Sequence, residues 1–334
     1  MTRHASIIGT GSYLPETVMT NEDFERIVET SDEWIVSRTG ISSRHVVAEG
    51  ETTSDLAARA AQIAMDRAGV TADDIDMLFV GTTSPDYIMP STACMTQAKL
   101  GLKCPAVDFM AACTSWMYAL QSAAALVESG RANNVLVIGA EALTRLVDFS
   151  DRSTCVLFGD GAGAVVVGVS VEPGIEAVVL GADGTGAEQL IIPDGGAAKP
   201  FSAETAENHD QFVKMNGSEV FKFAVRVIPR ATKEALAKSG HSLEDLRWLI
   251  PHQANQRIIA TIEERLGIDD DHVYLNLAHT GNTSAASIPL ALDDLYTSGR
   301  LAPGDLLALV GFGAGLTWGA AVVRWTLATL NEEA

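Results

Sequence analysis

The sequence predicts an α/β fold built from two related halves. Short apolar, β-branched segments alternate with helical patterns of about 10 to 20 residues, which is typical of sheets covered by helices. The helical segment that follows Cys113 is apolar nearly all round, and a helix of this kind lies buried between layers. Several short motifs also recur in the same order in both halves of the chain. Together these observations indicate a duplicated α/β unit.

The expected elements follow from local patterns. We expect strands at 5–8, 77–80, 106–110, 134–138, 163–169, 248–250, 306–310 and 320–325, and helices at 54–68, 91–100, 114–129, 220–239, 255–266 and 284–296. Residues 306–323 carry no charge over a length that would suit a membrane helix, but four glycines divide them, so they predict a buried hairpin. Residues 183–209 are rich in Gly, Ala, Pro and acidic residues and predict a long surface connection.

The duplication places two helix starts in equivalent positions. Cys113 is followed 16 residues later by Ser-Gly-Arg, and Asn282 is followed 16 residues later by the same three residues. The join is expected near 171–174, which gives halves of residues 1–172 and 173–334. A pseudo-twofold axis between these halves would bring the two helix N-termini together at the centre of the molecule.

Composition excludes several classes of protein. The chain of 334 residues has 23 basic and 43 acidic side chains, a net charge of −20, which argues against nucleic acid and anionic membranes as partners. No two of its four cysteines have CxxC spacing, so we expect no zinc or redox motif. The N-terminal residues show no signal-peptide pattern, which predicts a cytoplasmic protein with free thiols. Cys94, Cys104 and Cys155 are expected to be buried structural cysteines.

Three side chains are candidates for chemistry. Cys113 lies at a strand-to-helix turn, where the helix N-terminus favours a nucleophilic thiolate, although a buried structural cysteine would also fit. His252 follows the strand 248–250, at the end where α/β proteins bind ligands, although a lone turn histidine is the plainer interpretation. Asn282 would head the second buried helix, where it could also be an ordinary N-cap. The duplication favours a meeting of all three side chains.

Glycine-rich segments separate into two kinds. Residues 9–11 and 159–163 lack the strand-loop-helix context of a dinucleotide or phosphate loop, so we expect no cofactor loop at 9–11 and a tight turn at 159–163. Residues 312–315 lie between two predicted strands. Glycines there let backbone N–H groups approach a ligand closely, as an oxyanion hole requires.

Five segments carry a family resemblance that covers essentially the whole chain. They are 30–41, 158–163, 251–255, 281–287 and 315–319. With them the chain resembles the β-ketoacyl-[acyl carrier protein] synthase III family of thiolase-like condensing enzymes. The resemblance implies a duplicated αβαβα five-layer fold, which agrees with the internal repeat, and no cofactor beyond a coenzyme A thioester substrate.

The resemblance also implies roles for individual residues. Cys113 would be the acylated nucleophile, with His252 and Asn282 completing the triad, and the backbone N–H groups of Cys113 and Ala314 would form the oxyanion hole. Further residues are implied for coenzyme A and pantetheine (Trp34, Arg38, Arg152, Gly217, Asn255), for the acyl pocket (Met89) and for the carrier-protein patch (Lys222, Arg257). The sequence departs from the family pattern after the cysteine, with Thr114-Ser115, and has Met89 and Glu264 where Phe and a basic residue are usual.

The activity that the resemblance implies is a decarboxylating Claisen condensation. An acyl-CoA primer and malonyl-acyl carrier protein would give 3-oxoacyl-acyl carrier protein and start fatty-acid synthesis, in a homodimeric enzyme. Two alternatives stay open: a related Cys-His-Asn condensing or acyl-transfer enzyme of a secondary-metabolite pathway, and a non-catalytic acyl-CoA-binding module.

Overall fold

The computed structural model describes residues 3–329, whose strands form two main sheets. The first sheet has the order β1-β7-β6-β4-β5. Its strands are β1 (His4–Tyr13), β4 (Met77–Gly81), β5 (Ala106–Phe109), β6 (Asn134–Glu141) and β7 (Gly161–Ser170). β4 runs parallel to β5 and β6, and β7 is antiparallel to β6 and β1. β5 is therefore an edge strand of this chain.

The second sheet comes from the C-terminal part of the chain, in the order β11-β12-β13-β8. Its strands are β8 (Ile175–Ala182), β11 (Trp248–Pro251), β12 (Leu306–Gly313) and β13 (Thr317–Arg324). β12 and β13 pair antiparallel from Leu306↔Arg324 to Gly313↔Thr317. The uncharged segment is thus the buried hairpin that the sequence predicts, and no helix within residues 3–329 is long and apolar enough to cross a bilayer.

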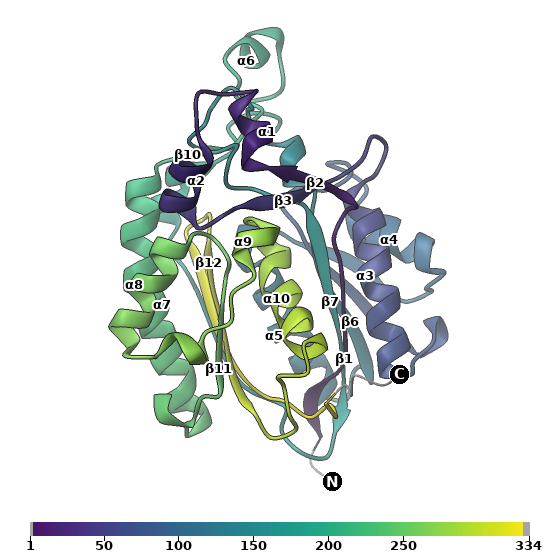
Figure 1. The fold of residues 1–334 in the computed structure, drawn as a ribbon. Helices are drawn as coiled ribbons and strands as arrows, with labels where there is room; N and C mark the ends of the chain where they lie inside the picture. The colour runs from purple at the N-terminus through teal and green to yellow at the C-terminus, as the bar shows by residue number, and fades with distance from the viewer. Residues whose placement is uncertain (1–2, 330–334) are drawn as a thin grey trace.

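Helices form three layers around the two sheets (Figure 1). α5 (Ser115–Glu128) and α10 (Ser287–Thr297) lie between the sheets, in one apolar core with side chains of both. α3 (Thr53–Ala68) and α4 (Thr92–Leu100) cover the outer face of the first sheet, and α7 (Gly217–Ser239) and α8 (Gln256–Leu266) cover the second. This arrangement is the predicted αβαβα order.

Smaller elements gather at one end of the layers, at the top of Figure 1. They are β2 (Thr17–Thr20), α1 (Asn21–Glu25), α2 (Asp32–Thr39), β3 (Ser43–Val46), β9 (Leu190–Ile191), α6 (Ala203–Glu207), β10 (Lys214–Met215) and α9 (Leu277–Thr280). The prediction of a plain surface connection at 183–209 is wrong in part, because this segment forms β9 and α6, and Leu190 to Ile192 line a cavity beside Cys113.

Two local predictions have clear structural outcomes. A side chain at Gly9 or Gly11 would collide with the backbone of α3 at Ala64 or Ala60, so these glycines let a helix pack closely on β1 and serve no cofactor loop. Cys104 and Cys155 are buried free cysteines, as expected. Cys94 is exposed, so its prediction as a buried cysteine is wrong.

Candidate active site

Cys113 lies at the turn between β5 and the buried helix α5. It is the middle residue of a short 3-10 turn, η2 (Ala112–Thr114), which leads directly into α5. The turn requires a positive φ of 49° at Ala112, a conformation that non-glycine residues adopt only when the surroundings hold it. The thiol is 8% exposed, at the bottom of a cavity. Cys113 thus lies at the predicted strand-to-helix turn and lines a cavity.

The two residues after Cys113 brace this turn. The Thr114 hydroxyl donates to the Ala111 carbonyl and bonds Thr317 Oγ1, each at 2.7 Å. The Ser115 hydroxyl donates to the Ala112 carbonyl and accepts the Ala111 N–H. The departure from the family pattern at these positions is therefore accommodated by bonds that lock the conformation of η2.

His252 lies directly after β11, and its ring is held on two sides. Its backbone N–H donates to the Val310 carbonyl at 2.7 Å, and its ring lies 5.4 Å from the Phe312 ring, edge to face. Nδ1 is 2.6 Å from the hydroxyl of Ser287, which also accepts the Gln253 N–H at 3.4 Å. That oxygen can therefore use its own hydrogen to donate to Nδ1, and the ring hydrogen then belongs on Nε2.

Asn282 precedes a second 3-10 turn, η7 (Ser284–Ala286), which leads into α10. Its backbone is fixed against the chain before β7: its N–H donates to the Leu157 carbonyl, and its carbonyl accepts the Gly159 N–H. Its side-chain oxygen accepts the Ser284 N–H at 2.9 Å. The amide Nδ2 is thereby turned toward the cavity. Asn282 lies two residues before its turn, whereas Cys113 lies within its own, so the two positions are alike but not identical.

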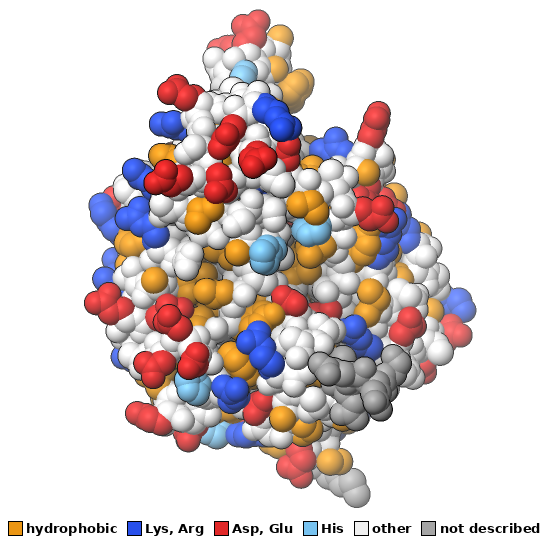
Figure 2. Space-filling view, in the orientation of Figure 1, with side chains coloured by type: hydrophobic (Ala, Val, Ile, Leu, Met, Phe, Trp, Pro, Cys, Tyr) orange, Lys and Arg blue, Asp and Glu red, His pale blue; other side chains and the backbone are white. Residues whose placement is uncertain are grey.

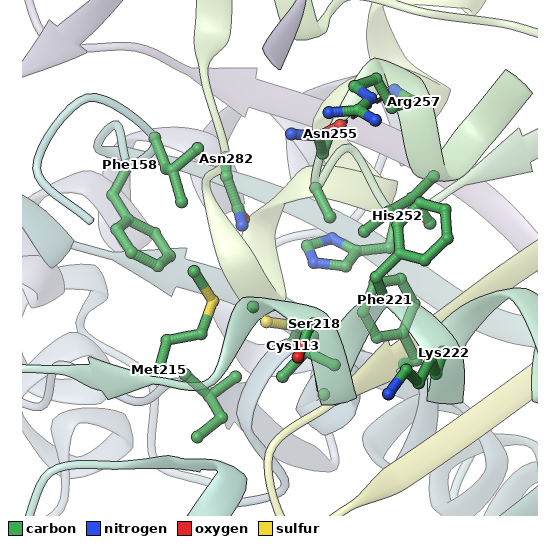
Figure 3. Close-up of a pocket in the computed structure, with 18 of the residues that line it drawn as sticks. Cys113, Phe158, Met215, Ser218, Phe221, Lys222, His252, Asn255, Arg257 and Asn282 are labelled. Atoms are coloured by element: carbon green, nitrogen blue, oxygen red, sulfur yellow. Dashed lines mark hydrogen bonds between the residues drawn. The ribbon is translucent and has the colours of Figure 1, made fainter. Parts of the chain in front are cut away.

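The three side chains face one cavity (Figure 3). The amide of Asn282 and the imidazole of His252 point toward the sulfur of Cys113, and all three line a cavity of about 720 Å³. A smaller, largely apolar chamber of about 90 Å³ adjoins Cys113 on another side. Its lining includes Leu143, Phe158, Leu190, Ile191, Ile192, Val213 and Ala314. Cys113 therefore lies at the junction of a wide cavity and a small apolar chamber.

Burial controls the ionisation of the site. It raises the pKa of the Cys113 thiol to about 12, and it lowers the pKa of the His252 imidazole to about 3. Both groups are therefore neutral near pH 7. The expectation of a thiolate at the helix N-terminus is not met in the free protein, because desolvation of the charged form outweighs the helix end.

Glycine at position 313 leaves the backbone of Cys113 accessible. A Cβ at Gly313 would lie 2.8 Å from the Cys113 backbone nitrogen, where it would crowd that N–H. The neighbouring Ala314 lines the small chamber beside the thiol. Glycine at position 313 thus leaves space beside the Cys113 N–H, and the oxyanion hole of Cys113 and Ala314 stays a prediction.

Three of the five predicted coenzyme A residues line the larger cavity, and the other two, Trp34 and Arg152, are linked to it through Arg38. Two guanidinium groups lie near the ring of Trp34 in α2, with Arg38 Cζ at 5.6 Å and Arg152 Cζ at 4.9 Å from its ring centre. Arg38, Gly217 and Asn255 line the cavity itself, together with Lys222 and Arg257. Figure 2 shows basic side chains gathered on the side where Figure 1 places α2 and α8.

Met89 lies apart from this arrangement. Its side chain is 85% exposed and does not line either cavity beside Cys113. With Tyr87, Ile88 and Met110 it forms an exposed apolar patch next to the edge strand β5. An acyl-pocket role for Met89 within its own chain is therefore not seen.

Sequence reasoning missed other residues of the site. The residues not singled out are Ser284 of the second turn, Ser287 at the start of α10, Glu141 at the end of β6, and Met215 and Phe221 in the cavity wall. Only their positions in the fold bring them to the site. Among residues 3–329 no group of three or more His, Cys, Asp or Glu side chains could hold a metal ion.

Family models and curated relatives match the family that the sequence motifs indicate. Family models described as 3-oxoacyl-[acyl carrier protein] synthase III and its C-terminal part match residues 107–184 and 236–325, and one described as stage V sporulation protein AD matches 47–144. The β-ketoacyl-[acyl carrier protein] synthase III of Caldanaerobacter subterraneus is 50% identical, over 96% of this chain and 98% of the relative.

Solved structures agree with this match. The β-ketoacyl-[acyl carrier protein] synthase III of Thermus thermophilus has a TM-score of 0.88 and 49% identity, over 96% of this chain and 99% of that one. A priming β-ketosynthase of the R1128 polyketide biosynthetic pathway has a TM-score of 0.91 and 37% identity, with 97% of each chain covered. With half of its residues identical along nearly its whole length, and with the thiolase-like fold in common, this chain belongs to the β-ketoacyl-[acyl carrier protein] synthase III family.

Proposed function

We propose that this protein condenses an acyl-CoA primer with malonyl-acyl carrier protein and so initiates fatty-acid synthesis. The observation that carries this proposal is the convergence of Cys113, His252 and Asn282 where the wide cavity meets the small apolar chamber. The thiol would take the acyl group from coenzyme A, and the acyl chain would occupy the chamber. Malonyl-acyl carrier protein would then enter, lose CO2 and attack the acyl-enzyme to give 3-oxoacyl-acyl carrier protein.

In the first half-reaction the Cys113 sulfur attacks the thioester carbon. Because burial keeps the thiol neutral, its proton has to leave as the bond to carbon forms, and the departing coenzyme A sulfur has to gain one. The developing oxyanion would be bound by the backbone N–H groups of Cys113 and Ala314. A preorganised donor of this kind typically contributes about 3–4 kcal/mol to the transition state.

The second half-reaction places negative charge on the malonyl thioester oxygen. His252 and Asn282 are suited to receive it because both are neutral hydrogen-bond donors aimed at the cavity. The Ser287 hydroxyl donates to Nδ1 of His252 and so favours the tautomer with its hydrogen on Nε2. The Ser284 N–H binds Oδ1 of Asn282 and so leaves Nδ2 facing the cavity. A carboxylate in place of Asn282 would instead favour proton abstraction.

The entrance suits a coenzyme A thioester. The group of Arg38, Trp34 and Arg152 offers an aromatic face and positive charge at the surface, which fits an adenine nucleotide with its phosphates. The pantetheine arm would then run past Gly217 and Asn255 toward Cys113.

The carrier protein would dock at the same mouth. Lys222 and Arg257 line it, and their charge would attract an acidic partner. Lys222 is paired with Glu219 at 2.7 Å, which reduces the local positive charge. Arg257 is therefore expected to contribute more to docking than Lys222.

The assembly is proposed to be a homodimer. Tyr87, Ile88, Met89 and Met110 are 59% to 88% exposed, and they lie beside the unpaired edge of β5. An apolar patch next to a free strand edge is a surface that proteins usually cover. In such a dimer Met89 would reach the partner's acyl chamber. We further propose a cytoplasmic location, no cofactor, and a division of the chain into halves 1–172 and 173–334.

A second function shares the same chemistry. The 37% identity to a priming polyketide ketosynthase and the replacement of the usual Phe by Met89 favour a role in loading unusual primers for a secondary-metabolite pathway. Intact-mass analysis after incubation with acetyl-, branched- and aromatic-CoA would separate the two, since fatty-acid initiation predicts preference for short straight or branched chains.

The test of the mechanism compares the two half-reactions in the same variants. His252→Ala and Asn282→Ala should still form the acyl-enzyme on Cys113, because the sulfur and its oxyanion hole remain. They should release CO2 from malonyl thioester about 10²- to 10³-fold more slowly, because each lacks one donor to the enolate oxygen. Release of CO2 at the wild-type rate by either variant would remove that residue from the proposed mechanism.

A further inference from the structure

Glu141 is a buried carboxylate next to the site that the proposed mechanism does not use. It ends β6 and is 0% exposed. One side of it is held by the loop after β4: Oε2 accepts the Ser84 N–H at 3.0 Å and the Ser84 hydroxyl at 2.6 Å, while the Thr83 N–H lies 3.0 and 3.1 Å from its two oxygens. Burial raises the pKa of Glu141, and these donors oppose that rise because they favour the charged form.

The other side of Glu141 reaches the turn that leads into α10. Its Oε1 accepts the Ala285 N–H at 3.4 Å, and the Ser284 hydroxyl is a further hydrogen-bond partner. This contact joins residues 144 positions apart in the sequence. Ser284 has a φ of +47°, which a non-glycine residue keeps only when its surroundings hold it. The carboxylate therefore helps to hold a strained turn in place.

That turn sets the orientation of Asn282. The Ser284 N–H donates to Asn282 Oδ1 at 2.9 Å, and this bond is what turns Nδ2 toward Cys113. We propose that Glu141 is a positioning residue for Asn282, acting through the turn at Ser284 and Ala285. The inference rests on the proposed function, in which Nδ2 binds the malonyl thioester oxygen during decarboxylation.

The variant Glu141→Gln removes the hydrogen bond to the Ala285 N–H and keeps the bonds to the loop after β4. The Oε2 position receives a backbone N–H and two hydroxyls besides the shared Thr83 N–H, so the glutamine carbonyl oxygen belongs there. Its NH2 then occupies the Oε1 position and faces the Ala285 N–H, donor against donor. The Thr83 hydroxyl can rotate to accept from that NH2. The loop 82–84 thus stays satisfied, while the turn at 284–285 loses its acceptor.

The expected loss falls on the second half-reaction. Displacement of a catalytic group by about 1 Å can slow a reaction 10²-fold, so CO2 release from malonyl thioester by Glu141→Gln should fall about tenfold to hundredfold. Acyl loading, measured as acyl-enzyme mass on Cys113, should not slow, because the charge of Glu141 raises the pKa of the Cys113 thiol and its removal favours the thiolate. Thr82→Val is the matched control, because it removes a hydroxyl donor to the same carboxylate on the loop side and leaves the Ala285 bond in place. It should alter neither rate by more than about twofold.

A double-mutant cycle tests whether the effect passes through Asn282. Glu141→Gln should slow CO2 release in the wild-type background and add nothing in the Asn282→Ala background. Rates are normalised to the fraction of protein that can be acylated, which removes simple losses of folded protein. Should Glu141→Gln fail to fold, Glu141→Asp keeps the charge but is too short to span both segments, and the same split between the two half-reactions is expected.

Two results would overturn the inference alone: equal losses in loading and CO2 release, or a further loss from Glu141→Gln in the Asn282→Ala background. An Asn282→Ala variant with wild-type CO2 release would instead refute the proposed role of Asn282, and the inference with it. The failure of this inference and the failure of the proposed function are therefore distinguishable.

Discussion

The alkylation rate of Cys113 should rise with pH without levelling off up to about pH 9. Burial raises the pKa of this thiol to about 12, so about one molecule in 10⁴ carries the thiolate at pH 8, and the fraction grows about tenfold with each pH unit. Only the thiolate reacts with iodoacetamide. A plot of the logarithm of the rate against pH should therefore be straight with a slope near one, whereas an ordinary cysteine approaches a plateau above its pKa of about 8.5.

The assay needs a background without the exposed Cys94, which also reacts. The variant Cys94→Ser is treated with iodoacetamide between pH 6 and 9, and the added mass is followed over time. Cys94→Ser/Cys113→Ala gives the residual reaction of the two buried cysteines. A plateau with a midpoint below about pH 8 would refute the reasoning, because it would show that the helix N-terminus outweighs the desolvation of the sulfur.

Three further outcomes test separate contacts. Ser287→Ala removes the partner of His252 Nδ1 and should lower CO2 release about tenfold while acyl loading stays within twofold; equal losses in both would contradict the tautomer argument. Trp34→Ala removes the ring proposed to stack on the adenine, a contact worth about 1–3 kcal/mol. KM for acyl-CoA should therefore rise about tenfold at unchanged kcat, and an unchanged KM would exclude Trp34 from binding. Sedimentation at micromolar concentration should give a dimer mass, and a monomer mass would contradict the proposed dimer. Met89→Phe should shift the acyl-CoA loading profile, and an unaltered profile would contradict the pocket role of Met89.

Local sequence patterns predicted parts of the layering, while the five-layer order was implied by the family resemblance. The apolar character of the helix after Cys113 predicted its position between two sheets, and the glycines within 306–323 predicted the hairpin. The strand-end position of His252 was also correctly predicted. These features depend on residues close together in the chain, so a single sequence contains them.

Features that depend on distant residues were missed. Ser287 supports a ring 35 positions away, and Glu141 bonds a turn 144 positions away, so neither pattern is visible locally. The segment at 183–209 has the composition of a loop, yet Leu190 to Ile192 line the small chamber because the chain returns over Cys113. The thiolate expectation was not met for the same reason: a helix N-terminus is a local feature, whereas burial of the sulfur is produced by the whole fold.

The unequal sizes of the two cavities at Cys113 affect how many times one acyl group can be elongated. In the proposed reaction a short acyl group would occupy the 90 Å³ chamber and leave the 720 Å³ cavity free for the second thioester. The product of the proposed condensation is two carbons longer and leaves on its carrier. If it returned, the extra length would extend from the chamber into the path of the next malonyl group. The small chamber therefore favours one condensation per acyl group, as an initiating enzyme needs. Repeated elongation would require an enzyme with a deeper chamber.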